Sequence, residues 1–185
     1  LEYFLNPNDL DPSSNFRAPI LVGNVNLMEQ FSPLARIDFE AKNSFNMAAE
    51  LRKDRALSLS FDNNLLTEVK GIEYIAKFGY RFKDVIFSTK LADSPTGIIK
   101  SDIDLKVEFS YRNNKTIVRY LDYENNQLGG GQNLWSAKLS AKYDLSKNLA
   151  VLFYYDHSFS KAVISTSFPM TNIRSGFTLR YSFGN

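Results

Sequence analysis

The fold of this chain is decided by DIDLKVEFSYR, residues 102–112, in which polar and apolar side chains alternate without interruption. Successive side chains of a β-strand point to opposite faces, so this segment predicts one apolar face and one charged face. A helix of the same sequence would scatter its charges around the whole circumference. The apolar set is Ile103, Leu105, Val107, Phe109 and Tyr111.

The same alternation recurs from Pro33 to the end of the chain. The further apolar positions that it predicts are Ile37, Phe39, Leu57, Leu59, Phe61, Tyr74, Phe78, Tyr80, Phe82, Trp135, Leu139 and Tyr143. The polar positions are Arg36, Asp38, Glu40, Lys77, Arg81, Asp104, Lys106, Glu108, Lys138, Lys142 and Arg180. We therefore predict an all-β fold, with irregular loop and short strands in residues 1–32 and about nine or ten antiparallel strands in residues 33–185.

Polar and glycine-rich stretches mark the expected connections. Lys53-Asp54-Arg55 is predicted to be a charged turn. Asn113-Asn114 is predicted to be a tight turn, because Asn tolerates the positive φ that such turns require. Residues 125–133, which include Gly129-Gly130-Gly131, are predicted to be a loop.

Composition excludes several classes of function. The chain has 185 residues, enough for one domain, and a net charge of +2 gives no electrostatic basis for binding nucleic acid. Without cysteine, neither a disulfide framework nor a thiolate metal site is possible. No stretch approaches the roughly 18 apolar residues of a spanning helix. The first residues lack the features of a signal peptide, so we expect a mature chain or a piece of a longer one.

Alternation alone fits a soluble sandwich, a soluble binding barrel or an outer-membrane barrel. Two features favour the membrane. The expected strands, about 9 to 12 residues long, match the length of a tilted membrane strand. Tyr and Trp residues also lie near their ends, where an amphipathic ring suits the headgroup level. We therefore expect the apolar face to lie against lipid and the polar face to line a hydrated lumen, where mixed charges form ion pairs between neighbouring strands.

Nothing in the sequence indicates chemistry. His157 is the only histidine and has no partners at catalytic or metal-binding spacing, so we interpret it as a residue at the end of a loop. The run Gly129-Gly130-Gly131 lacks the Lys and Ser/Thr of a phosphate-binding loop and is interpreted as a flexible turn. We predict no enzyme, and no catalytic, cofactor-binding or metal-binding residues.

Several segments together resemble a known family. The strongest are FSYRNNKTIVRYL at residues 109–121 and ISTSFPMTNIRSGFTLRYSF at residues 164–183. Weaker matches lie at residues 29–34, 57–68, 77–85 and 140–156. They are similar, in the same order, to the C-terminal end of the SprA/Sov family, the outer-membrane translocon of the type 9 secretion system.

This resemblance implies that the chain holds the closing strands of a very large single-chain barrel in the bacterial outer membrane, through which cargo proteins cross. The implied partners are membrane lipids, the rest of the same polypeptide, a smaller barrel shuttle protein (PorV-like), plug and periplasmic accessory proteins, and secreted cargo proteins. Phe177, Leu179, Tyr181 and Phe183 resemble the C-terminal signal that barrel-assembly machinery reads. A complete small outer-membrane barrel, acting as anchor or narrow pore, and a soluble binding barrel stay open as alternatives.

Overall fold

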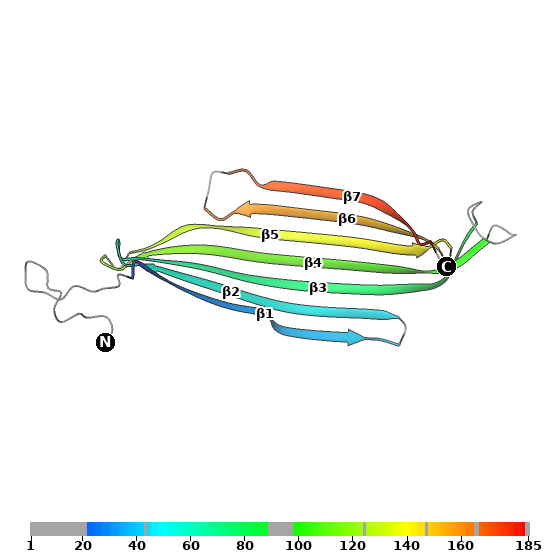
Figure 1. Ribbon diagram of the computed structural model, residues 1–185, viewed down its shortest axis with the longest axis horizontal. Coiled ribbons are helices and arrows are strands. Elements are labelled where there is room, and N and C mark those ends of the chain that lie inside the picture. Colours follow the sequence, from blue (N-terminus) through cyan, green and yellow to red (C-terminus); the bar gives the residue numbers. More distant parts are fainter. Residues whose placement is uncertain are drawn as a thin grey trace, which may run out of the picture.

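A computed structural model describes residues 22–42, 44–88, 98–123, 125–146, 148–164 and 167–183. Seven antiparallel strands form one sheet, and each strand pairs with its neighbours in sequence (Figure 1). They are β1 (Asn24–Glu40), β2 (Phe45–Ser60), β3 (Leu65–Ser88), β4 (Ile98–Tyr120), β5 (Asn125–Asp144), β6 (Leu149–Ala162) and β7 (Met170–Tyr181). The predicted all-β fold is confirmed, and within this part of the chain there is no helix long and apolar enough to cross a membrane.

The described strands are fewer and longer than predicted. The sequence predicted about nine or ten, whereas the structure describes seven, of 12 to 24 residues each. Lys53-Asp54-Arg55 lies inside β2 and Asn113-Asn114 inside β4, so neither is a turn. Around these two segments, β2 and β4 carry polar side chains on both faces. A short run of polar residues is also typical of a turn, so the sequence pattern did not distinguish the two. β1 begins at Asn24, inside the segment predicted to be loop and short strands, and residues 1–21 lie outside the described part.

The run Gly129-Gly130-Gly131, predicted to be a flexible turn, is also part of a strand. The register of β5 against β4 shifts here, so that Thr116 pairs with Gly130 and Ile117 with Leu128. Gly129 is the extra residue of a β-bulge. Gly131 has a φ of 151°, and a Cβ at this position would collide with the backbone oxygen of Asn114. Glycine is therefore required by the close approach of two strands.

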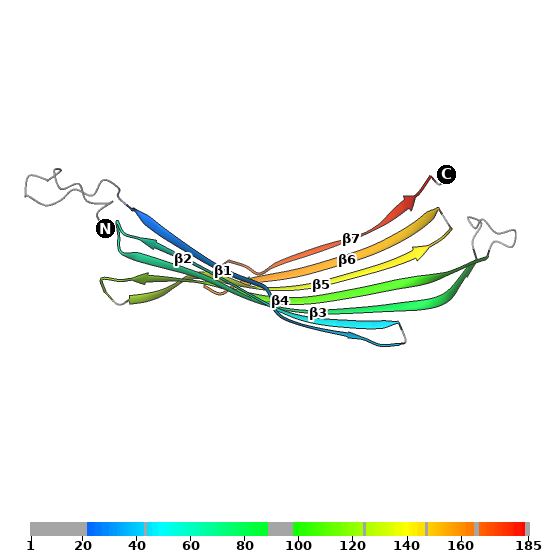
Figure 2. The ribbon, with the colours of Figure 1, turned by 60° about the horizontal axis from the view of Figure 1, so that its bottom comes forward.

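The sheet is open and bent along its strands into a trough (Figure 2). β1 and β7 do not pair with each other, and their outer edges have no partner strand among the described residues. No second layer covers either face within this part of the chain, so hardly any hydrophobic core exists. Ile75, on the polar face of β3, is the one buried hydrophobic residue that the described ranges contain. A sheet of this kind needs another medium or partner to cover its apolar side.

Candidate functional site

Strand pairing aligns the apolar side chains into five consecutive rows, here called the apolar band, because directly paired residues share a face. From the end of the sheet where β7 finishes, the rows are Phe82, Ile103, Tyr143, Val151, Leu179; Phe45, Tyr80, Leu105, Ala141, Phe153, Phe177; Phe39, Met47, Phe78, Val107, Leu139, Tyr155, Ser175; Ile37, Ala49, Ala76, Phe109, Ala137, His157, Ile173; and Ala35, Leu51, Tyr74, Tyr111, Trp135, Phe159, Thr171. None of these positions holds Asp, Glu, Lys or Arg.

The length of the apolar band along the strands follows from strand geometry. Trp135 and Tyr143 stand in its two outermost rows, eight residues apart on β5. At a rise of about 3.3 Å per residue, the band extends about 26 Å along the strand. Its side chains are open to the surroundings: Phe109 is 51% exposed and Phe177 is 72% exposed. The band is therefore continuous, uncharged and uncovered.

Aromatic rings are concentrated at both limits of the apolar band. At one limit Tyr74, Tyr111, Trp135 and Phe159 stand side by side on four successive strands and are here called the aromatic row. Ring centroids lie 5.1 Å apart for Tyr111 and Trp135, and 5.5 Å apart for Trp135 and Phe159. The opposite limit has ring contacts between three further pairs, Tyr80 and Phe82, Phe87 and Tyr143, and Tyr181 and Phe183.

Two tyrosine hydroxyls show how these rings are oriented. The Tyr111 hydroxyl donates a hydrogen bond to Asn133 Oδ1 at 3.3 Å, on the side of the aromatic row away from the band. The Tyr143 hydroxyl donates to the backbone oxygen of Val85 at 3.2 Å, beyond the other limit. Both polar ends point out of the band while the rings cover its borders, which is the orientation that an apolar layer between two polar zones favours.

The opposite face carries a line of charges, one from each strand, here called the charge belt. Its members, from β1 to β7, are Arg36, Glu50, Lys77, Glu108, Lys138, Asp156 and Arg174, and their signs alternate. The last five are directly paired in one row, and Arg36 and Glu50 are paired in the adjacent row. The ion pairs within the charge belt are Arg36 to Glu50 at 3.1 Å, Lys77 to Glu50 at 2.7 Å, Lys77 to Glu108 at 4.0 Å, Lys138 to Glu108 at 3.2 Å and Arg174 to Asp156 at 2.8 Å. The predicted ion pairs between neighbouring strands are confirmed.

Glu50 is the centre of this network. Its side chain is only 2% exposed and accepts hydrogen bonds from Arg36, from Arg52 at 2.8 Å and from Lys77. A buried carboxylate is tolerated only when cations and donors replace its water. Three cations from three strands therefore converge on one acid and fix the register of β1, β2 and β3.

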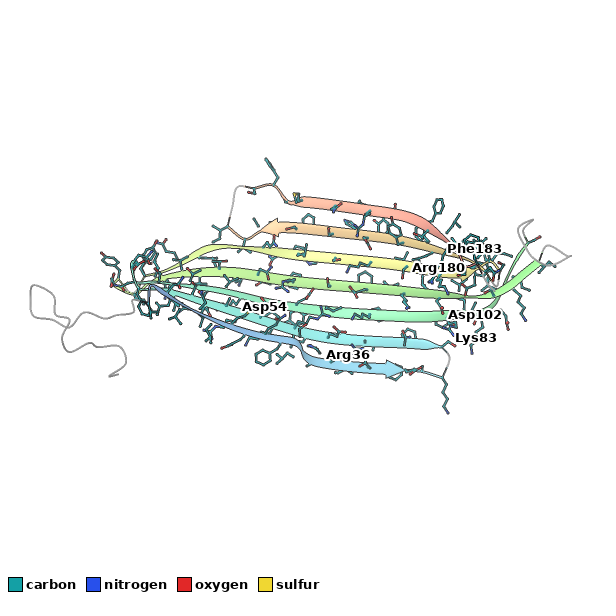
Figure 3. The ribbon with its side chains drawn as sticks, viewed as in Figure 1. Arg36, Asp54, Lys83, Asp102, Arg180 and Phe183 are labelled. Carbon is teal, nitrogen blue, oxygen red and sulfur yellow. The ribbon has the colours of Figure 1, made fainter. Side chains whose placement is uncertain are left out.

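Further ion pairs follow the polar face toward the end where β7 finishes. Arg81 contacts Asp104 at 2.6 Å, and Lys142 contacts Asp144 at 3.0 Å. Figure 3 shows Lys83, Asp102, Arg180 and Phe183 gathered at this end, while Arg36 and Asp54 lie nearer the middle of the sheet.

The structure brings together nearly all of the residues that the sequence singled out. The residues expected to face lipid lie on the face of the apolar band, except Phe61, which begins the turn after β2. The residues expected to face a lumen all lie on the opposite face. Phe177, Leu179 and Tyr181 share the face of the apolar band, and Phe183 follows β7.

Sequence reasoning missed part of each face. Glu50, Asp156 and Arg174 complete the charge belt, and Phe159 completes the aromatic row. The sequence shows that these residues alternate with residues of the other kind along each strand. It does not show which residues of neighbouring strands they stand beside. His157, interpreted as a residue at the end of a loop, lies inside β6 on the face of the apolar band, with its ring centroid 6.3 Å from that of Tyr155.

The described residues contain no group of three His, Cys, Asp or Glu side chains that could hold a metal ion. A shallow hollow of about 750 Å³ lies along the aromatic row, where the small side chains of Ala49, Ala76 and Ala137 stand between larger rings. A comparison with protein-family models finds no match to this chain, and a comparison with curated proteins finds none either.

Proposed function

We propose that this chain is a membrane-spanning β-wall, with the apolar band against lipid and the charge belt against a water-filled interior. One observation carries the proposal: five successive rows across the sheet contain no Asp, Glu, Lys or Arg and are bounded by aromatic rings. Nine residues of β5, from Trp135 to Tyr143, cross these rows, which agrees with the about 9 to 11 residues of a tilted transmembrane strand. Water-soluble proteins rarely expose so large an apolar surface.

The proposed location is the bacterial outer membrane. A β-sheet can lie in lipid only if every strand edge is paired, because unpaired backbone groups cost several kcal/mol each there. β1 and β7 each leave one edge open within the described part of the chain. In the proposed protein these edges pair with further strands, and the seven described strands form one section of a larger closed wall.

Within that wall, we propose the role of the closing section of the type 9 translocon, which lets cargo proteins cross the outer membrane. The resemblance of residues 109–121 and 164–183 to the SprA/Sov family supports this role. The charge belt is compatible with it, because alternating signs give a hydrated surface without the strong single-sign field that would retain passing proteins of opposite charge. The proposed neighbours are a smaller barrel shuttle protein, plug and periplasmic accessory proteins, and the cargo.

A complete small outer-membrane barrel, acting as anchor or narrow pore, is the second candidate. The structure describes seven strands, and the smallest membrane barrels have about eight. This similarity in strand number favours the second candidate. Both candidates predict the same two faces, so the strand pattern does not separate them.

The mass of the intact polypeptide separates them. Outer membranes are isolated, and the chain is detected with an antibody against residues 109–121. The first candidate predicts a polypeptide many times the 21.1 kDa of this chain, and the second predicts one close to that mass. Recovery of the chain in the soluble fraction would contradict both candidates and the membrane location with them.

A further inference from the structure

Beyond the aromatic row, the face that carries the apolar band becomes basic. The next two rows are Phe31, Lys53, Ile72, Asn113, Asn133, Lys161 and then Glu29, Arg55, Lys70, Lys115, Gly131, and together they are here called the basic rows. Lys70 and Lys115 are directly paired, and Arg55 is paired with Lys70. Like charges directly opposite each other destabilise a strand pair.

Acidic side chains compensate only part of this charge. Glu29 lies 3.9 Å from Arg55. Glu68, in the following row, accepts hydrogen bonds from Arg119 at 2.5 Å and Arg55 at 2.7 Å, and lies 3.6 Å from Lys70. Its side chain is 3% exposed, so these contacts use it fully. Lys53, Lys115 and Lys161 have no carboxylate within ion-pair distance in the ranges that the structure describes.

The polar face at the same level behaves differently. Arg112 contacts Asp54 at 2.7 Å and Glu73 at 3.6 Å, and Arg52 contacts Glu73 at 3.7 Å. Arg112 and Arg52 are therefore matched by acids of other strands, Asp54 on β2 and Glu73 on β3. The uncompensated positive charge belongs to the face of the apolar band, and it begins directly beyond the aromatic row.

We propose that the basic rows bind the phosphate groups of anionic lipid headgroups, an inference that rests on the proposed membrane location. Lys70 lies four residues beyond Tyr74, about 13 Å along the strand. The headgroup zone adds roughly 5 to 8 Å on each side of the hydrocarbon core, and a tilted strand and the flexible lysine stem shorten the distance to it. The ammonium groups therefore reach headgroup level.

A lipid fits this surface better than a soluble anion for two reasons. A phosphate between Lys70 and Lys115 replaces their repulsion with two charge-assisted hydrogen bonds. The same molecule places its acyl chains over the aromatic row and the adjoining hollow, where Ala76 and Ala137 leave room among the rings. A free phosphate gains only the first of these contacts.

Trp135 supplies the test, because it is the only tryptophan of the chain and stands in the aromatic row beside β4. The intact polypeptide that contains this chain is reconstituted into phosphatidylcholine bilayers that contain either brominated phosphatidylcholine or brominated phosphatidylglycerol, so that the outer edges of β1 and β7 keep their partners. The quenching that is lost in a Trp135→Phe variant is assigned to Trp135. Bromine quenches Trp135 only on contact, so the ratio of the two quenching curves gives the relative affinity for the anionic lipid. We expect a preference of about fivefold or more, which falls as salt is added.

Two variants with equal loss of charge assign the preference to a face. Lys70→Gln combined with Lys115→Gln should bring the affinity ratio close to one. Lys106→Gln combined with Lys142→Gln, on the polar face, should leave it unchanged. Lys115→Gln alone serves as the milder variant if the double variant does not fold, and it should lose part of the preference.

The remaining outcomes contradict specific statements. Equal quenching by both lipids in the unaltered chain, or a preference that survives in the Lys70→Gln, Lys115→Gln variant, would overturn the headgroup site. So would loss of the preference when inorganic phosphate replaces chloride at the same ionic strength, since the site would then be one for soluble anions. No quenching by either lipid would contradict the membrane location itself, whereas quenching by both without preference contradicts the headgroup site alone.

Discussion

Lys77 on β3 donates a hydrogen bond of 2.7 Å to Glu50 on β2, and the side chain of Glu50 is almost completely removed from solvent. The two residues are offset by two positions along the strands rather than directly paired, since Lys77 stands opposite Ala48 and Glu50 opposite Ile75. Because Arg36 and Arg52 contact the same carboxylate, Glu50 neutralises cations from three strands.

Glu50→Gln is therefore expected to destabilise the sheet, because it keeps the shape of the side chain and leaves three cations without their shared acid. We expect a loss of about 1 to 3 kcal/mol in the free energy of unfolding, toward the lower end because the cations are partly exposed. Urea unfolding followed by Trp135 fluorescence measures it. Combining Glu50→Gln with Lys77→Met should restore part of the loss, and an unchanged urea midpoint for Glu50→Gln alone would contradict a central role for this carboxylate.

The position of a residue within the apolar band should determine how much free energy of folding is lost when an arginine replaces it. Val107 belongs to the central row, so Val107→Arg is expected to cost about 2 to 4 kcal/mol in a bilayer, whereas Thr171→Arg, in the outermost row, should cost about 0 to 1 kcal/mol. Folding titrations into lipid vesicles measure both. Lys106→Gln, on the opposite face beside Val107, should be mild. Equal costs for Val107→Arg and Thr171→Arg would rule out a lipid layer centred on this row.

Alternation in the sequence was sufficient to assign faces, because the two-residue period is a local property of each strand. It could not supply the rows, since register depends on turn lengths and on bulges such as the one at Gly129. The same limitation explains the turns wrongly predicted at residues 53–55 and 113–114. Beyond the aromatic row the apolar face carries Arg55, Lys70 and Lys115, so the pattern that identified the strands disappears while the strands continue.

Glu68 should make stability depend on pH in the acid range. The hydrogen bond from Arg119, together with that from Arg55, holds the pKa of this carboxyl below its ordinary value of 4.5, against the opposing effect of burial. A depressed pKa in the folded state means that this contribution is complete above about pH 4.5 and is lost as the pH falls through the depressed value.

Glu68→Gln should abolish that contribution. Urea midpoints measured from neutral pH down to the acid range are expected to fall less steeply for the variant than for the unaltered chain. Asp122→Asn, at an exposed turn, serves as the control and should follow the unaltered chain. If the urea midpoints of Glu68→Gln and the unaltered chain fall in parallel with pH, the ion pairs of Glu68 make no measurable contribution to the pH dependence of stability.

Lys115→Glu should have opposite effects in two lipid environments. Facing Lys70, the new carboxylate replaces a repulsive pair with an attractive one, which is expected to stabilise the chain by about 0.2 to 1 kcal/mol in phosphatidylcholine bilayers. Adding phosphatidylglycerol should stabilise the unaltered chain, because the anionic headgroups then relieve the repulsion, but it should stabilise Lys115→Glu less. Unfolding free energies in both bilayers measure the difference, with Lys106→Gln as a variant on the opposite face that should gain from phosphatidylglycerol as the unaltered chain does. If Lys115→Glu destabilises the chain in phosphatidylcholine, the two lysines do not repel each other across β3 and β4, and the physical reason for an anion between them disappears.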